Sequence, residues 1–134
     1  MIYIFKNDRY FISNSKINFH NLISLSLLSD FNYKMTETNR IEYKRELSDG
    51  LEKEVIAFLN YREGGILYIG IDKEGNTYGL ADADGDQLKI KDRLKNNIRP
   101  SALGLFDIVS EERDNKNILK IIVASGPEKP YHLK

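Results

Sequence analysis

Three acidic residues stand where a metal site could form. Asp72 ends the apolar run GGILYIGID, and Glu37 and Glu42 lie in the segment TETNRIEYK. The carboxyl end of a buried strand is where α/β sheets expose functional groups, and carboxylates are the ligands that Mg²⁺ and Mn²⁺ prefer. If the three side chains converge, they form a metal-dependent phosphodiesterase site. Convergence requires a bend in the chain, because the five-residue spacing puts Glu37 and Glu42 on opposite faces of a regular strand.

A second interpretation of the same residues needs no site. Asp72 then begins a turn and Glu37 is solvated. Glu42 pairs with Lys44 or Arg45. The sequence pattern alone leaves both interpretations open.

A row of cations is expected on one helix. Lys91, Lys95 and Arg99 recur every four residues and therefore share a helix face. Lys89 and Arg93 form an adjoining row. Such rows neutralise backbone phosphates without reading bases, which makes binding sensitive to salt. The alternative is a solvated helix face with neighbouring aspartates as local partners.

Composition narrows the classes of function. Twenty Lys plus Arg balance twenty Asp plus Glu among 134 residues, so any contact with nucleic acid must come from a local patch. The absence of cysteine excludes disulfides and thiolate metal sites, and it fits the cytoplasm, where we expect the protein. No apolar run approaches the roughly 20 residues of a membrane span, so we expect no membrane partner.

The chain divides into two parts by composition. Residues 1–34 contain no Gly, Pro, Ala or Glu, whereas residues 35–134 have ordinary globular composition. The first part is either a genuine N-terminal extension or the result of a start assigned too early, with Met35 as the natural first residue. As an extension it would form strands near residues 2–5 and 9–12 and a helix over residues 18–28.

From Met35 onward the pattern predicts an α/β (α+β) fold, with a mixed central sheet flanked by two main helices. Strands are expected over residues 40–47, 66–72, 105–111 and 118–124, with a returning hairpin arm at 77–80. The first helix begins near Leu51 and is stopped by Gly64 and Gly65, and the second runs from Asp84 to about Arg99.

The two predicted helices differ in their apolar faces. The first has one strong face, formed by Leu51, Val55, Phe58 and Leu59. The second has a thinner stripe and should be more exposed; its members are Leu88, Leu94 and Ile98. Capping-box spacing occurs at both helix starts, in the pairs Asp49 with Glu52 and Asp84 with Gln87. Four tyrosines could stack on bases, although those in helix and strand are expected in the core: Tyr43, Tyr61, Tyr68 and Tyr78.

Several motifs together resemble a known family. The segment ETNRIEYKREL, followed by a helix ending in FLNYREGGILYIGIDKEGNTYGL, resembles the opening half of the Schlafen AlbA-like domain, a bacterial family often labelled as DNA-binding or transcriptional-regulator domains. The resemblance runs from about Glu37 to His132. The combination of E-x4-E-F/Y-K, a helix with A-F-x-N, and G-G-x-L-x-I-G-I/V-D is specific, whereas each piece alone is weak. It implies an α/β domain that contacts nucleic acid.

The resemblance also bears on the acidic residues. In the eukaryotic Schlafen branch that cleaves tRNA and rRNA, three carboxylates at these motif positions form a metal-dependent nuclease site. The matching positions here are Glu37, Glu42 and Asp72. The resemblance therefore implies that they cluster, with Mg²⁺ or Mn²⁺ as the cofactor of a nuclease, although clustering is not catalysis.

The sequence departs from the family at its C-terminal end. The family domain continues past the P-Y-H segment into a further strand, whereas this sequence ends at Lys134. We therefore expect the domain over residues 35–134 to lack its last strand, and an unpaired sheet edge favours a homodimer. The nuclease branch encloses RNA between two lobes, so a nuclease would also need a dimer or a partner.

We expect a nucleic-acid-binding domain of a transcriptional regulator, with DNA or RNA as its partner. The phosphate contacts would come from Lys89, Lys91, Arg93, Lys95 and Arg99, with Lys44 and Arg45 beside the acidic site. The first alternative is an endoribonuclease in which Glu37, Glu42 and Asp72 hold the metal. Lys44 would then steady the scissile phosphate. The second alternative is a protein-interaction module without nucleic acid, which the zero net charge favours.

Overall fold

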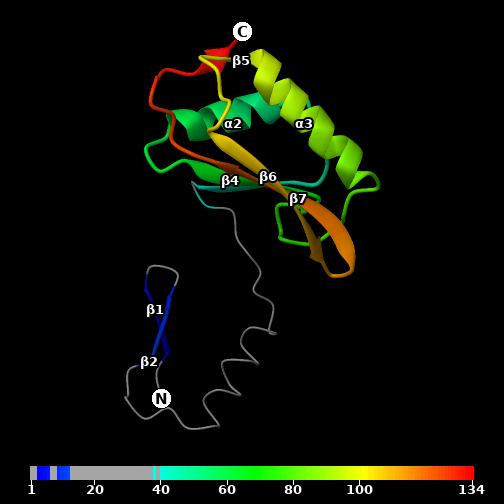
Figure 1. The fold of residues 1–134 in the computed structure, drawn as a ribbon. Helices are drawn as coiled ribbons and strands as arrows, with labels where there is room; N and C mark the ends of the chain where they lie inside the picture. The colour runs from blue at the N-terminus through cyan, green and yellow to red at the C-terminus, as the bar shows by residue number, and fades with distance from the viewer. Residues whose placement is uncertain (1–2, 7–8, 13–37, 39) are drawn as a thin grey trace. The chain divides into compact units, whose positions relative to one another are not determined.

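The computed structural model describes residues 3–6, 9–12, 38 and 40–134 (Figure 1). Its contacts divide the chain into two compact units, Met1–Tyr33 and Lys34–Lys134. Each unit is described by itself below.

The first unit contains a two-stranded hairpin. β1 (Tyr3–Lys6) pairs antiparallel with β2 (Arg9–Ile12). These are the two strands that the sequence predicts in this region. The predicted helix over residues 18–28 lies outside the described residues.

The second unit is built on a four-stranded mixed sheet. Its strands, in spatial order, are β3 (Ile41–Lys44), β4 (Gly65–Ile69), β7 (Lys116–Val123) and β6 (Phe106–Arg113). β3 runs parallel to β4, and the other two pairings are antiparallel. This confirms the predicted α+β fold with a mixed sheet. The returning arm predicted at residues 77–80 is reduced to a single bridge between Ile71 and Thr77.

Two helices in the described part of the chain cover one face of this sheet (Figure 1). α2 (Leu51–Asn60) and α3 (Ala83–Asn97) pack on apolar side chains from β4 and β7. A short ladder of β5 (Ile98–Arg99) and β8 (His132–Leu133) follows the end of α3. Neither helix is long and apolar enough to cross a membrane.

α2 forms where its apolar spacing predicts it. Leu51, Val55 and Leu59 are buried against the sheet, which confirms the predicted face. The predicted capping box at its start is wrong, because Gly50 is the N-cap and no side chain caps the helix. The Glu52 carboxylate instead accepts hydrogen bonds from Arg93 and Asn97 of α3.

α3 begins earlier than its sequence suggests. Asp82 is the N-cap, and its side chain accepts a hydrogen bond from the Gly85 amide, so the predicted capping box of Asp84 with Gln87 is wrong. The predicted apolar stripe is wrong at Leu88, which is 70% exposed. Ile90 and Leu94 are the residues that α3 buries from its central turns.

A side-chain clamp fixes the C-terminal segment of the chain. The Asn60 side chain donates to the Tyr131 carbonyl at 2.9 Å and accepts from the Tyr131 amide at 2.7 Å. The Tyr131 ring is buried in the main core, and its atoms lie where a Cβ on Gly126 would be. The A-F-x-N and P-Y-H segments of the sequence are therefore in direct contact, and this contact is structural.

The other face of the sheet carries a smaller apolar cluster. Tyr43, Tyr68, Ile71 and Ile118 are buried there. The Tyr43 and Tyr68 rings are 5.5 Å apart. Two of the four tyrosines considered for base stacking are therefore core residues, as predicted for those in strands.

Candidate nucleic-acid interface

Two members of the predicted acidic trio, Glu42 and Asp72, lie in the described part of the chain, and each has hydrogen-bond partners close by. Glu37 lies outside the described residues. Glu42 stands opposite Leu67 in the parallel register of β3 and β4, five residues before Asp72. Among the described residues, no group of three or more His, Asp or Glu side chains is placed to hold a metal ion.

Glu42 belongs to a small charged cluster on the helix-covered face of β3. Lys44 Nζ lies 2.8 Å from Glu42 Oε1 and 3.1 Å from Glu54 Oε1, which comes from α2. Partial burial acts to lower the pKa of Lys44, but hydrogen bonds to Glu42 and Glu54 and their charges outweigh it and raise this pKa. Lys44 thus stays protonated and holds the two carboxylates together.

Asp72 organises the turn after β4. Its two carboxylate oxygens accept hydrogen bonds from Asn76, one from the backbone amide at 2.8 Å and one from the side-chain amide at 3.0 Å. Its carbonyl accepts from the Gly75 amide. These contacts give Asp72 the turn-forming role that the second interpretation of the sequence assigned to it.

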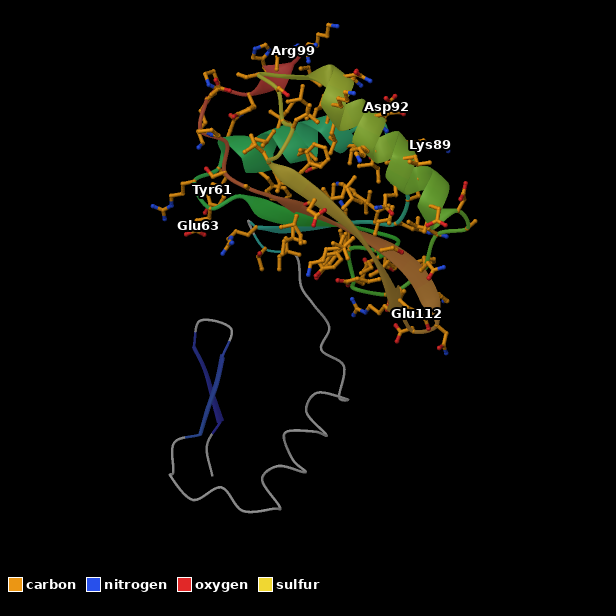
Figure 2. All side chains as sticks on the ribbon, viewed as in Figure 1. Tyr61, Glu63, Lys89, Asp92, Arg99 and Glu112 are labelled. Carbon is orange, nitrogen blue, oxygen red and sulfur yellow. The ribbon has the colours of Figure 1, made fainter. Side chains whose placement is uncertain are left out.

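The outer face of α3 carries exposed cations. Lys89, Lys91 and Lys95 are all solvent-exposed, and Figure 2 shows Lys89 on the side of α3 that faces away from the sheet. Lys89 is 67% exposed and lies 3.7 Å from Asp86, a distance at which an exposed pair contributes little. Lys91 and Lys95 form no ion pair with any residue in the described ranges.

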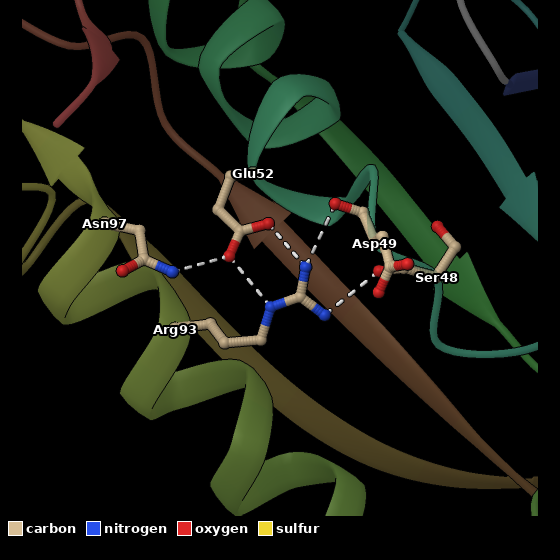
Figure 3. A network of polar contacts seen from close by, with 5 residues as sticks. All are labelled: Ser48, Asp49, Glu52, Arg93 and Asn97. Carbon is tan, nitrogen blue, oxygen red and sulfur yellow. Dashed lines mark hydrogen bonds and ion pairs between the residues drawn. The ribbon is translucent and has the colours of Figure 1, made fainter.

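Arg93 has a different environment from these lysines (Figure 3). Its guanidinium binds both carboxylate oxygens of Glu52, with Nε to Oε1 at 2.8 Å. Two further N–H donors reach the carbonyls of Ser48 at 3.0 Å and Asp49 at 3.3 Å. Asn97 adds a third hydrogen bond to Glu52 at 2.9 Å. We call Glu52, Arg93 and Asn97 the helix seam, because they join the start of α2 to α3.

The hydrogen bonds of the seam shift the pKa values of Glu52 and Arg93. Glu52 is only 6% exposed. Hydrogen bonds from Arg93 and Asn97 outweigh the burial and lower the pKa of Glu52 to about 2. The bonds to Glu52 likewise raise the pKa of Arg93 above its usual range. The helical spacing predicts Arg93 in a phosphate-binding row. In the structure, four of its five N–H donors form hydrogen bonds within the protein.

Arg99 closes the C-terminal end of α3. Its guanidinium donates to the carbonyls of Ile98 at 2.8 Å and Asn96 at 3.5 Å. It is half-buried, and its backbone pairs with β8. Such contacts with the last helical carbonyls favour a cation at this helix end.

Arg45 lies on Tyr78, one of the four tyrosines considered for base stacking. The Arg45 guanidinium carbon is 4.0 Å from the centre of the Tyr78 ring, and Tyr78 is 47% exposed. An exposed aromatic ring with a cation stacked on it is a recognised arrangement for contact with bases. The sequence predicts Tyr78 within a strand arm over residues 77–80 and therefore in the core, but the structure places it outside any helix or strand and leaves its ring exposed.

Together these features define an α+β domain with a mixed sheet under two helices and an exposed cationic helix face. The model of the Schlafen AlbA_2 family matches residues 37–134, and the chain belongs to this family. This confirms the resemblance read from the motifs. No curated protein sequence matches the chain.

Two solved structures are similar in fold. One is the DIP2311 protein from Corynebacterium diphtheriae, at 25% identity and a TM-score of 0.55, over 84% of this chain but only 23% of that protein. The other is the N-terminal domain of a Nitrosomonas europaea protein whose name relates it to the ATP-dependent DNA helicase RecG. It has 23% identity and a TM-score of 0.60, over 81% of this chain and 78% of that domain.

Proposed function

We propose that this domain binds DNA as the nucleic-acid-binding module of a transcriptional regulator. The observation that carries the proposal is the exposed cationic face of α3, where Lys91 and Lys95 have no ion-pair partner in the described part of the chain. Family membership and the nucleic-acid-related name of a protein similar in fold support it. The face presents charges at helical spacing, so binding through backbone phosphates is expected.

The test is a salt titration of binding to labelled duplex DNA by fluorescence anisotropy. Replacing Lys91 and Lys95 together by Gln should weaken binding to all sequences and reduce the salt slope by about 2, because each lost phosphate contact removes about one unit. The matched control replaces Lys53 and Lys73, which are exposed elsewhere, and changes the net charge equally. Equal loss in both double variants, or binding that ignores salt, would refute the proposal and favour a protein-interaction module.

The endoribonuclease alternative is tested with the same protein preparations. Labelled tRNA is incubated with Mn²⁺ or with a chelator, using the wild type and Asp72→Ala. Fragments that require both the metal and Asp72 would establish a nuclease that assembles Glu37, Glu42 and Asp72. A mobility shift without fragments, unchanged by the substitution, is the result expected of a binding domain.

A further inference from the structure

A hollow in the surface lies beside the Arg45–Tyr78 pair. Its volume is about 440 Å³, and its walls include Arg45, Glu46, Tyr78, Leu80 and Asp86. This volume falls within the range of about 300–1,000 Å³ that small-molecule sites occupy. We call it the Tyr78 hollow.

The wall that carries Tyr78 is held in place by its backbone. The amides of Tyr78 and Gly79 both donate to the Gly70 carbonyl, at 2.8 and 3.0 Å, and the Leu80 amide donates to the Asn117 carbonyl. Gly79 has a φ of +76°, and a Cβ there would lie 2.7 Å from the Lys116 side chain. The segment therefore runs close against β7, and the Tyr78 ring is presented from a fixed backbone.

The wall that carries Arg45 is fixed at both ends. At one end, the Lys44 carbonyl accepts hydrogen bonds from the Gly70 and Ile71 amides. At the other end, Arg93 holds the carbonyls of Ser48 and Asp49. Because the backbones that carry Arg45 and Tyr78 are both held by hydrogen bonds, binding of a planar ligand requires little ordering of the backbone.

The charges in the hollow favour a base over a phosphate. Glu46 and Asp86 add two carboxylates to the lining, opposing the single cation of Arg45. Carboxylates repel phosphate, but they accept hydrogen bonds from the exocyclic amino groups of cytosine and adenine. Thymine and uracil have no such group. A paired base in a duplex cannot stack here, because both of its faces are already covered by neighbouring bases.

We propose that the Tyr78 hollow receives an unpaired nucleobase that carries an exocyclic amino group. The base stacks on the Arg45–Tyr78 pair, and Glu46 accepts a hydrogen bond from its amino group. This inference rests on the proposed nucleic-acid binding and specifies it: the domain engages single-stranded DNA and prefers bases with an exocyclic amino group over thymine.

The experiment compares the affinities of labelled single strands of equal length, (dC), (dA) and (dT), for the wild-type chain and three variants. Tyr78→Ala should weaken (dC) and (dA) binding about fivefold or more, because it removes the stacking surface. Tyr78→Phe keeps the ring and should bind both strands as the wild type does. Glu46→Gln should reduce the preference for (dC) and (dA) over (dT), because the new side-chain amide can donate a hydrogen bond to a thymine carbonyl. Ultraviolet cross-linking of a strand containing 5-iodocytosine should map to Tyr78.

The outcomes separate this inference from the proposed function. One outcome is that the Lys91 and Lys95 double variant weakens binding while Tyr78→Ala binds every strand as the wild type does. In that case the hollow is not a base site, and the cationic face of α3 is still the surface that binds nucleic acid. An unchanged base preference in Glu46→Gln would refute the assigned hydrogen bond. If the wild type binds no strand and no duplex, both proposals fail together. Arg45→Ala, at an exposed position, provides the second test if Tyr78→Ala unfolds.

Discussion

The helix seam and the Tyr78 hollow place the same chemical group in opposite surroundings. In the seam, the Arg93 guanidinium faces a buried carboxylate and two backbone carbonyls, and its hydrogen bonds are made within the protein. In the hollow, the Arg45 guanidinium lies on an exposed ring. The comparison teaches that the available acceptors decide the role of an arginine, and helical spacing does not. Arg93 joins two helices of the fold, whereas Arg45 stays exposed, where we propose that it meets a base.

The largest expected effect is that of breaking the seam. Arg93→Ala should lower the free energy of unfolding by about 3–5 kcal/mol, because it leaves Glu52 charged, buried and unpaired. Urea unfolding followed by circular dichroism measures this. Replacing Glu52 and Arg93 together by Gln and Leu should recover part of the loss, since no uncompensated charge remains. A loss below 1 kcal/mol for Arg93→Ala would mean that the seam is solvated and that Arg93 is available to phosphate.

The seam should also give stability a dependence on acid. The folded pKa of Glu52, about 2, lies below its unfolded value, so the ionised carboxylate stabilises the fold above about pH 4.5. This contribution should be lost as the pH falls from 4.5 toward 2, and the difference amounts to roughly 3 kcal/mol. Urea unfolding at several pH values measures it. Glu52→Gln should flatten this part of the profile, and an unchanged slope would assign the acid sensitivity to other carboxylates.

An intermediate effect is expected from disturbing the hollow through its backbone. Gly79→Ala should lower stability by about 1–2 kcal/mol, because its left-handed conformation disfavours a Cβ. The contact with Lys116 should add to this. Gly104→Ala is the matched control, since Gly104 has a φ of +82° but open space around it. Gly79→Ala should also weaken (dC) binding, whereas Gly104→Ala should not; thermal melts and anisotropy measure the two effects.

The smallest expected effect on stability is that of Arg45→Ala. An exposed cation–π contact contributes about 0.5–1 kcal/mol, so the free energy of unfolding should fall by no more than that. The same urea titration used for Arg93→Ala measures it. The comparison of the two arginines fails if Arg45→Ala destabilises the chain as much as Arg93→Ala does.

Elements with strong periodicity could be predicted without the structure. α2 buries the residues that its spacing indicates, and β4 is buried on both faces because its apolar run leaves no polar side. α3 was harder, since its apolar residues are few. Ile90 lies four residues before Leu94 and eight before Ile98, so it fits the helical spacing better than Leu88, and the structure buries Ile90 and exposes Leu88. The caps were missed because a side chain with a stronger tertiary partner, such as Glu52, does not cap its own helix.

The sequence by itself determined the family, the fold class and the presence of cations at helical spacing on α3. The tertiary structure alone decided which cations are available. Glu52 and Arg93 are 41 residues apart in the chain and meet through the packing of α2 on α3. Arg45 and Tyr78 meet because Gly70 binds both of their segments. Its amide donates to the Lys44 carbonyl, and its carbonyl accepts from the Tyr78 amide. Local patterns cannot encode such meetings, because the energy of a charge depends on the neighbours and the solvent that folding gives it.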